Sequence, residues 1–278
     1  MPSPYASMSL EQIRSDMNAR FKGGDAYATT LPWDVLRHDH LHRELAIQVL
    51  SVTKSLPVGT ILRVIDVGCG IKPALCHPFL KQSLDHLRLD VTMIDLSDEA
   101  IARVERDALP KLAEMYGPLS EFRAIRIAAE DLAPGAMGTF DLAVSVESIE
   151  HWSDVDRGII GVRDCLKEGG SFVFTTPNRD ALHVRMGRKL GFEAPFCARD
   201  HVYEFGWKEI DRIVEKHRFR CVGFGGAGLT PYWALEGFLG GRMRDLTDRD
   251  VEVIEWLDSI GNRAPEFAFC QIKRFVAV

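Results

Sequence analysis

The sequence has few cysteines, and none has the paired spacing of a metal ribbon or a redox motif. Its six cysteines are scattered through 278 residues, without a CxxC pair or a dense cluster. Zinc ribbons need closely spaced cysteine pairs, and small secreted domains need a disulfide framework. The sequence therefore argues against both classes and is typical of a protein in the reducing cytoplasm.

Long hydrophobic runs and an excess of positive charge are also missing. No stretch approaches the roughly 18 uninterrupted apolar residues of a membrane helix, and residues 1–20 lack the apolar core of a signal peptide. The formal net charge of -6 gives no general attraction for nucleic acid or acidic membranes. We therefore expect no membrane association, and a small-molecule substrate rather than nucleic acid.

Repeats, low-complexity tracts and long linkers are absent as well, so one domain with insertions is the simplest organisation. Short β-branched runs alternate with helical stretches, which predicts an α/β fold with a doubly wound, mostly parallel, seven-stranded sheet. The expected strands are 61–67, 87–95, 122–127, 140–146, 171–176, 220–224 and 269–278. The expected helices are 73–86, 98–108, 155–167 and 207–217, with Ser97 and Ser153 as N-caps and 167–170 as a helix stop.

Three segments fall outside this alternation. We expect residues 1–58 to form an N-terminal helical lid on a ligand-binding domain, 59–278, whose insertions 180–205 and 225–266 shape the substrate pocket. The aromatic residues expected to contact substrate are Tyr27, Trp33, Tyr232 and Trp233. Core packing of the 35–49 helix pattern and a homodimer contact at 228–243 are the alternatives.

The first expected strand runs into a glycine-rich turn. Asp66 is followed by Gly68, Cys69 and Gly70, and two glycines at a strand end let the backbone approach a bound ligand closely. A dinucleotide loop would have a third glycine where Pro73 stands, and no P-loop lysine follows. The turn therefore belongs to another kind of ligand site, or it is purely structural.

The second expected strand ends with Asp95. An acid at this place can bridge the two hydroxyls of a ribose. The alternative is a carboxylate that caps the helix beginning near Ser97.

These and three later motifs resemble those of the class I S-adenosylmethionine-dependent methyltransferases. The resemblance runs from about Leu62 to Phe219 through VIDVGCG, MIDLSDEAI, AAEDL, FDLAVSVESIEH and LKEGGSFVFTTPN. It implies a Rossmann-like methyltransferase fold with S-adenosyl-L-methionine as the cofactor. The sequence departs from the family at Lys72, where many members have glycine, and at Ala128, where aspartate is common. The resemblance implies these cofactor-binding residues: Asp66, Gly68, Cys69, Gly70, Asp95, Leu96, Glu130, Asp131, Leu132 and Val146.

The stretch ESIEH follows the fourth expected strand directly. If the turn is helical, its spacing places Glu147, Glu150 and His151 on one face. Methyl transfer needs an aligned nucleophile and removal of its proton, so we expect His151 to be the catalytic base, with Glu147 beside it. The alternative is a solvated helix end whose carboxylates make only local hydrogen bonds.

A second histidine, His201, lies in ARDHVYEFGW. With ESIEH, this segment is similar to the small-RNA 3′-end 2′-O-methyltransferases, which implies a divalent Mg or Mn ion. The metal ligands by this resemblance are Glu147, Glu150, His151 and His201. The same motifs are common in small-molecule members, such as the ubiquinone-pathway O-methyltransferases. His201 could instead pack against Tyr203 or pair with Glu204.

Three hypotheses for function follow. The first is methyl transfer to an oxygen or nitrogen of a small-molecule metabolite, which the net acidity favours. The second is metal-dependent 2′-O-methylation of an RNA 3′ end or another vicinal diol. The third is a non-enzymatic regulator that only binds the cofactor, and the acid and histidine set of ESIEH argues against it.

Overall fold

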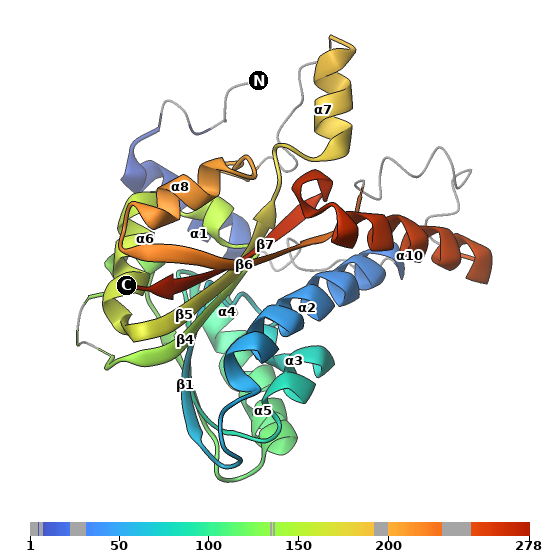
Figure 1. Cartoon of the computed structure of the whole chain (residues 1–278). Helices are drawn as coiled ribbons and strands as arrows, with labels where there is room; N and C mark the ends of the chain where they lie inside the picture. Colours follow the sequence, from blue (N-terminus) through green and yellow to red (C-terminus); the bar gives the residue numbers. More distant parts are fainter. Residues whose placement is uncertain are drawn as a thin grey trace.

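A seven-stranded sheet forms the centre of the molecule (Figure 1). The structure is a computed structural model that describes residues 5, 8–22, 32–133, 135, 137–191, 200–229 and 246–278. Its strand order is β3-β2-β1-β4-β5-β7-β6. The strands are β1 (Ile61–Val67), β2 (Arg88–Asp95), β3 (Glu121–Arg126), β4 (Phe140–Val146), β5 (Leu166–Pro177), β6 (Phe219–Ala227) and β7 (Cys270–Ala277).

The sheet is mostly parallel. Strands β1 to β5 pair in parallel, whereas β7 lies antiparallel between β5 and β6. The strand order reverses between β1 and β4, and ligands of open α/β sheets bind at the carboxyl edge beside such a reversal. The predicted doubly wound, mostly parallel sheet is therefore confirmed, and its topology directs attention to the turns after β1 and β4.

Helices cover both faces of the sheet (Figure 1). One face carries α2 (Pro32–Thr53), α3 (Pro78–Leu84), α4 (Asp98–Arg103) and α5 (Leu109–Tyr116), and the other carries α6 (Val155–Cys165) and α8 (Glu209–Glu215). Strand β1 contributes Leu62 and Val64 to the first core and Ile65 and Val67 to the second. Because both faces are buried, β1 has an almost continuous apolar sequence.

The remaining helices among the described residues lie around this central unit. They are α1 (Leu10–Lys22), α7 (Leu182–Lys189) and α10 (Asp248–Arg263), with short helical turns at Ala74–Cys76, Ala129–Asp131, Ile149–His151 and Pro265–Phe267. Helix α10 runs beside α2, where Asn262 donates a hydrogen bond to Glu44 (Figure 1). Within the described ranges, no helix has both the length and the apolar character needed to cross a membrane.

Two predicted helices have different boundaries in the structure. The helix predicted over 73–86 is divided by His77, which caps α3, and Pro78, whose fixed φ suits the first turn of a helix. The helix predicted over 98–108 is capped by Ser97, as expected, but it continues through a π-helical segment, Val104–Ala108, into α5. Gly117, with φ 81°, then ends the helix.

The prediction around α6 was wrong at both ends. Asp154 rather than Ser153 caps the helix, because Ser153 donates both its N–H and its hydroxyl to Glu130. The helix ends at Cys165, and residues 167–170 lie inside β5 instead of forming a helix stop. The helix predicted over 207–217 is shorter and spans Glu209–Glu215.

The second half of α2 is part of the core. Leu41, Leu45 and Val49 are fully buried in the core, where α2 packs against α3 and against β5, β6 and β7. Core packing, the alternative to a lid, therefore holds for this half of the helix. The first half of α2 extends toward the turn after β4, where Arg37 contacts Glu147.

Candidate functional site

The turn after β1 is a left-handed glycine turn closed by its own hydrogen bonds. Gly68 and Gly70 have φ values of 70° and 56°, a region that side chains rarely adopt. The N–H groups of Gly68 and Cys69 both donate to the carbonyl of Ile94, at 2.9 and 3.0 Å. The buried thiol of Cys69 has a pKa raised well above its ordinary value by burial. The turn therefore offers a close backbone approach rather than a reactive thiol.

Asp66, which is buried, and Asp95, which is half-buried, lie beside this turn. Asp66 accepts the N–H of Ala74 at 3.0 Å, and Asp95 accepts those of Gly70 at 2.9 Å and Ser97 at 2.8 Å. Burial, with a smaller effect of the Asp95 charge, raises the pKa of Asp66 to about 7. Burial also raises the pKa of Asp95, although its N–H donors oppose the shift. Ser97 itself caps α4, and Asp95 only accepts the N–H of this cap residue, so Asp95 is not the helix cap; its role at a ribose stays a prediction.

The AAEDL loop is fixed by its acids. Glu130 is buried, and its Oε1 accepts the N–H and the hydroxyl of Ser153 at 2.7 and 2.6 Å. Asp131 is paired with Arg14 of α1 at 3.1 Å. Leu132 packs in the core cluster on the α6 face. Glu130 thus holds the loop to Ser153, two residues before α6, and Asp131 holds it to α1. The adenine contact stays a prediction.

Two predicted cofactor residues lie at strand ends beside the turn after β1. Leu96 follows β2, and its carbonyl accepts a hydrogen bond from Arg126 at 3.3 Å. Val146 is the last residue of β4 and is half-buried. The sheet therefore brings the predicted cofactor residues of the β1, β2 and β4 ends to one edge.

Glu147 begins the turn after β4 in a strained conformation. Its φ is 48°, and its N–H is held by the carbonyl and the hydroxyl of Thr175 at 3.2 and 3.0 Å. Its carboxylate contacts Nη1 of Arg37 at 3.3 Å, the Thr175 hydroxyl at 3.2 Å and the Cys270 thiol at 3.6 Å. A non-glycine residue in the left-handed region is uncommon, and such strain clusters at functional sites.

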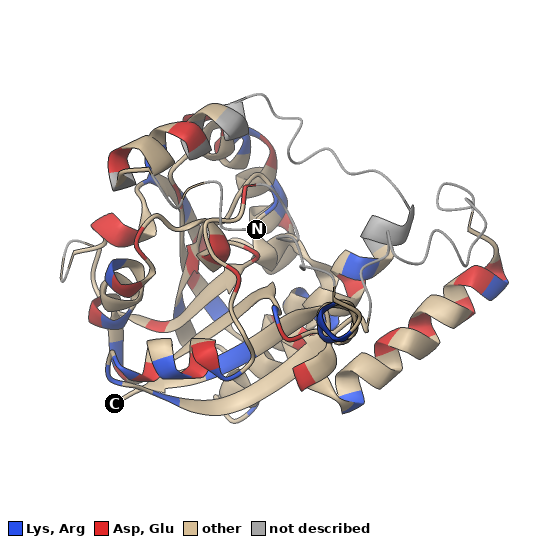
Figure 2. Ribbon diagram, turned by 90° about the horizontal axis from the view of Figure 1, so that it is seen from above, with Lys and Arg blue, Asp and Glu red and all other residues tan. Residues whose placement is uncertain are grey.

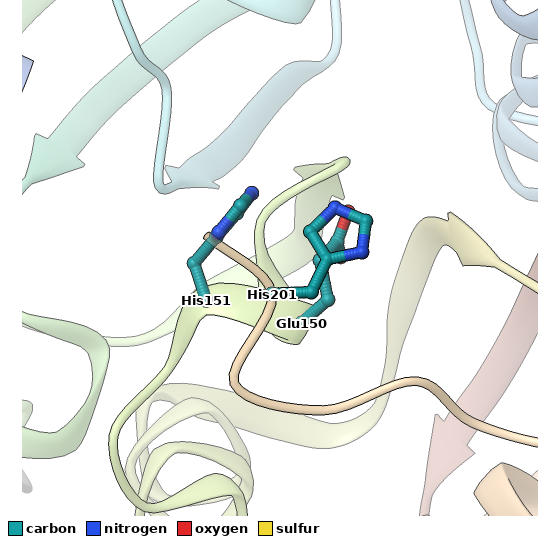
Figure 3. Close-up of side chains that lie close together, drawn as sticks. All are labelled: Glu150, His151 and His201. Atoms are coloured by element: carbon teal, nitrogen blue, oxygen red, sulfur yellow. The ribbon is translucent and has the colours of Figure 1, made fainter. Parts of the chain in front are cut away.

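Glu150, His151 and His201 come together beyond the end of β4 (Figure 3). Glu150 and His151 belong to the turn after β4, and His201 lies on the loop that precedes α8. One ligand atom from each of the three residues lies within 4.8 Å of the others. The centroids of the two imidazole rings are 5.0 Å apart. Three of the four predicted metal ligands are thus brought together, whereas the carboxylate of Glu147 is bonded to other groups.

Hydrogen bonds fix the orientation of both imidazoles. Nδ1 of His151 lies 3.0 Å from the backbone carbonyl of Asp200, and Nδ1 of His201 lies 3.0 Å from a carboxylate oxygen of Glu204. Carbonyl and carboxylate oxygens only accept, so each Nδ1 is the donor and each Nε2 of a neutral ring carries the lone pair. Metal-binding histidines are commonly oriented in this way by their second nitrogen. His201 therefore pairs with Glu204, as the alternative expected, in an arrangement that also suits a ligand.

The three groups have shifted proton affinities. Burial and the Glu147 charge raise the pKa of Glu150 to about 8, although the charge of His201 and the hydrogen bond from Thr176 oppose the shift. Burial and the charge of His201 lower the pKa of His151. Burial lowers the pKa of His201, but the bond to Glu204 and the charge of Glu150 outweigh it, so this pKa is raised overall. His151 is therefore the more readily neutral imidazole, as a general base must be.

The predicted substrate residues cannot be placed in the same way. Tyr27, Tyr232 and Trp233 lie outside the described residues, and for Trp33 only its place in the first turn of α2 is described. Their contact with substrate stays a prediction.

Several residues of the site were not predicted from the sequence. Thr175 and Thr176 follow from the topology, because β5 lies beside β4 and its carboxyl end meets the same edge; Thr176 donates to Glu150 at 2.9 Å. Arg37 and Cys270 come from α2 and β7, far away in sequence. No local pattern marks them, because only the folded sheet brings them to Glu147.

Comparisons with known proteins bear on the family of this chain. A family model described as a methyltransferase domain matches residues 25–222. The ubiquinone biosynthesis O-methyltransferase of Colwellia psychrerythraea is 26% identical over 200 residues, which are 70% of this chain and 76% of that protein. The protein of the same name from Paraburkholderia phymatum is 33% identical over 118 residues, which are 42% of this chain and 45% of that protein. This second match thus spans less than half of either protein.

The fold also has a counterpart among solved structures. A Haloferax volcanii protein, solved in complex with a methyltransferase activator, gives a TM-score of 0.54 at 16% identity and covers 97% of each chain. At this identity the likeness concerns the fold alone. The family match spans most of the chain and includes both the glycine turn and ESIEH, so the chain belongs to the methyltransferase-domain family. Its resemblance to the class I S-adenosylmethionine-dependent methyltransferases is thereby confirmed.

Proposed function

We propose that the protein transfers a methyl group from S-adenosylmethionine to an oxygen or nitrogen of a small-molecule acceptor. The observation that carries this proposal is the place of His151. It lies in the short helical turn after β4, its Nδ1 is fixed by the carbonyl of Asp200, and one of its ring nitrogens lies within 4.8 Å of ligand atoms of Glu150 and His201. A neutral imidazole held in this way is suited to remove the acceptor proton.

Charge supports a small acceptor over a nucleic acid. The net charge is -6, and Figure 2 shows acidic and basic residues interspersed along the described helices. A nucleic-acid site needs a concentrated basic surface. The relatives named ubiquinone biosynthesis O-methyltransferases favour an oxygen acceptor.

The proposal is tested by measuring S-adenosylhomocysteine release with a panel of phenols, catechols and amines. We expect His151→Ala to lower turnover roughly 10²-fold or more and to leave S-adenosylhomocysteine affinity nearly unchanged. The matched control is His86→Ala, because His86 bonds to Thr53 at the opposite end of the sheet. Full activity of the His151 variant would remove it as the base, and cofactor binding without turnover on any acceptor would favour the regulator.

A second candidate function is metal-dependent methylation of a vicinal diol, such as a catechol, a sugar or an RNA 3′ end. The specific observation in its favour is the Glu150, His151 and His201 group with both imidazoles oriented through Nδ1. One carboxylate and two imidazoles form a donor set that fits Mn²⁺, and Mg²⁺ with more water ligands. A bound cation would supply a positive charge that favours an ionised acceptor hydroxyl.

The metal is tested by calorimetry with MnCl₂ on the metal-stripped protein. His201→Ala should abolish the binding heat, whereas His217→Ala, a histidine that pairs with Asp156, should not. Binding should tighten as pH rises from about pH 6 to about pH 8, because burial raises the pKa of Glu150 to about 8 and a bound cation must displace that proton. Equal heats for wild type and His201→Ala would contradict the site.

A further inference from the structure

Arg37 binds the carboxylate that would be the fourth ligand of the metal group. Its Nη1 lies 3.3 Å from Oε2 of Glu147, and each side chain is 20% exposed. The close group of Glu150, His151 and His201 does not include Glu147. Glu147 is the first residue after β4 and precedes Glu150 by three positions. Glu147 thus lies beside the group while its carboxylate is held by a guanidinium.

Glu147 can change partners without a movement of the sheet. Its backbone is fixed, because its N–H is bonded to both the carbonyl and the hydroxyl of Thr175. Its side chain has several staggered rotamers, and a change among them moves only the carboxylate. If the carboxylate turns to another partner, it loses its present contacts with Arg37, the Thr175 hydroxyl and the Cys270 thiol.

Arg37 reaches this place from a firmly anchored helix. It lies one helical turn before Leu41, which is fully buried, as are Leu45 and Val49 further along α2. The buried half of α2 thus anchors the helix from which Arg37 reaches the end of β4.

We propose that Arg37 is a positioning residue that competes with a divalent cation for Glu147, so that its displacement adds a fourth ligand to the Glu150, His151 and His201 group. This inference rests on the metal-dependent form of the proposed function. A guanidinium and a divalent cation both bind carboxylate oxygens, and the cation brings the larger charge. Without metal, Arg37 neutralises Glu147; with metal, Glu147 turns to the cation and the first half of α2 loses this contact.

A purely structural ion pair would have the opposite effect on metal affinity. If Arg37 only held Glu147 in place, its removal would loosen the carboxylate and weaken cation binding. If Arg37 competes, its removal frees the carboxylate and takes a positive charge away from the site, so cation binding tightens.

The test is calorimetric titration of MnCl₂ into the complete, metal-stripped chain. Four proteins are compared: wild type, Arg37→Gln, Arg43→Gln and the double variant Arg37→Gln with Glu147→Gln. Arg43 lies on the same helix over the ring of Phe79 and controls for the loss of an arginine from α2. We expect Arg37→Gln to bind Mn²⁺ roughly tenfold more tightly than wild type, Arg43→Gln to match wild type, and the double variant to lose the gain.

The possible results distinguish the role of Arg37 from the existence of the metal site. Unchanged or weaker binding by Arg37→Gln, or a gain that persists in the double variant, overturns the role of Arg37 and leaves the metal site standing. Absence of Mn²⁺ binding in all four proteins overturns the metal site and this inference with it. Neither result affects methyl transfer itself, which is read from S-adenosylhomocysteine release.

Discussion

Gly68 couples the two turns of the site at the scale of single residues. A Cβ at this position would collide with the hydroxyl of Ser148, and that hydroxyl accepts a hydrogen bond from Nε1 of Trp152 at 3.1 Å. The glycine turn after β1 therefore lies directly against the ESIEH turn after β4. This contact fixes the position of the expected cofactor-binding residues relative to the residues expected to act on the acceptor.

We predict that Gly68→Ala destabilises the protein by roughly 2 kcal/mol or more, because it adds both a left-handed alanine and a collision with Ser148. The control is Gly59→Ala, since Gly59 has φ 80° but no atom within 4 Å of a new Cβ. That variant should lose about 1 kcal/mol from backbone strain alone. The free energies of unfolding in urea provide the comparison, and equal losses would contradict the proposed contact.

The buried Asp66 predicts a pH dependence of stability. Burial raises its pKa from 3.8 to about 7, so the native chain keeps a proton that the unfolded chain has lost. Its contribution to the free energy of unfolding therefore falls as pH rises from about pH 4 to about pH 7 and then levels off. Asp66→Asn retains an acceptor for Ala74 and should decline less than wild type over this window. Urea unfolding at about pH 5 and about pH 7 tests this, and parallel declines would count against it.

Helix α2 has two different roles along its length. Its second half fills the core with Leu41, Leu45 and Val49, while its first half brings Arg37 to Glu147. Helix α1 makes a comparable connection, because Arg14 joins Asp131 and Ser153 near the predicted adenine loop. If the N-terminal region acts as the predicted lid, its moving part is α1 and the start of α2, since the buried half of α2 cannot leave without opening the core.

We predict that Leu45→Ala lowers the free energy of unfolding by about 2–5 kcal/mol, because a fully buried leucine leaves a cavity. Ile47→Ala on the same helix should cost less than about 1 kcal/mol, since Ile47 is 48% exposed. The two variants are compared by chemical denaturation. Similar small losses would mean that α2 is a detachable lid along its whole length.

Helices and strands were predictable from the sequence where neighbouring residues determine them, and not where a distant segment does. Strand β1 was predictable because its apolar run and terminal glycines are local, and Ser97 was predictable as a cap because its hydroxyl reaches Ala100, three residues on. Ser153 looked like a cap by the same local rule, but Glu130 from a distant loop occupies its hydroxyl. Likewise, the division of the helix after the glycine turn depends on Pro78, whose effect on the chain direction a helix pattern does not include.

The whole molecule places motifs from across the chain at one sheet edge. The carboxyl ends of β1, β2 and β4 bring Asp66, Asp95 and Glu147 to it, and the loop before α8 adds His201. The sequence predicted this meeting through the order of its motifs along the chain. It did not predict Arg37 beside Glu147, because that pair joins residues 110 positions apart through the packing of α2.

The central claim is that this edge binds S-adenosylmethionine, and calorimetry with S-adenosylhomocysteine tests it most directly. We predict stoichiometric binding to the metal-stripped wild type and a loss of roughly tenfold or more in Asp95→Ala, because Asp95 is expected to hold the ribose hydroxyls. Asp98→Ala, an exposed acid paired with Arg126, should bind like wild type. Absence of binding heat with folded wild-type protein, or unchanged affinity in Asp95→Ala, would contradict the account.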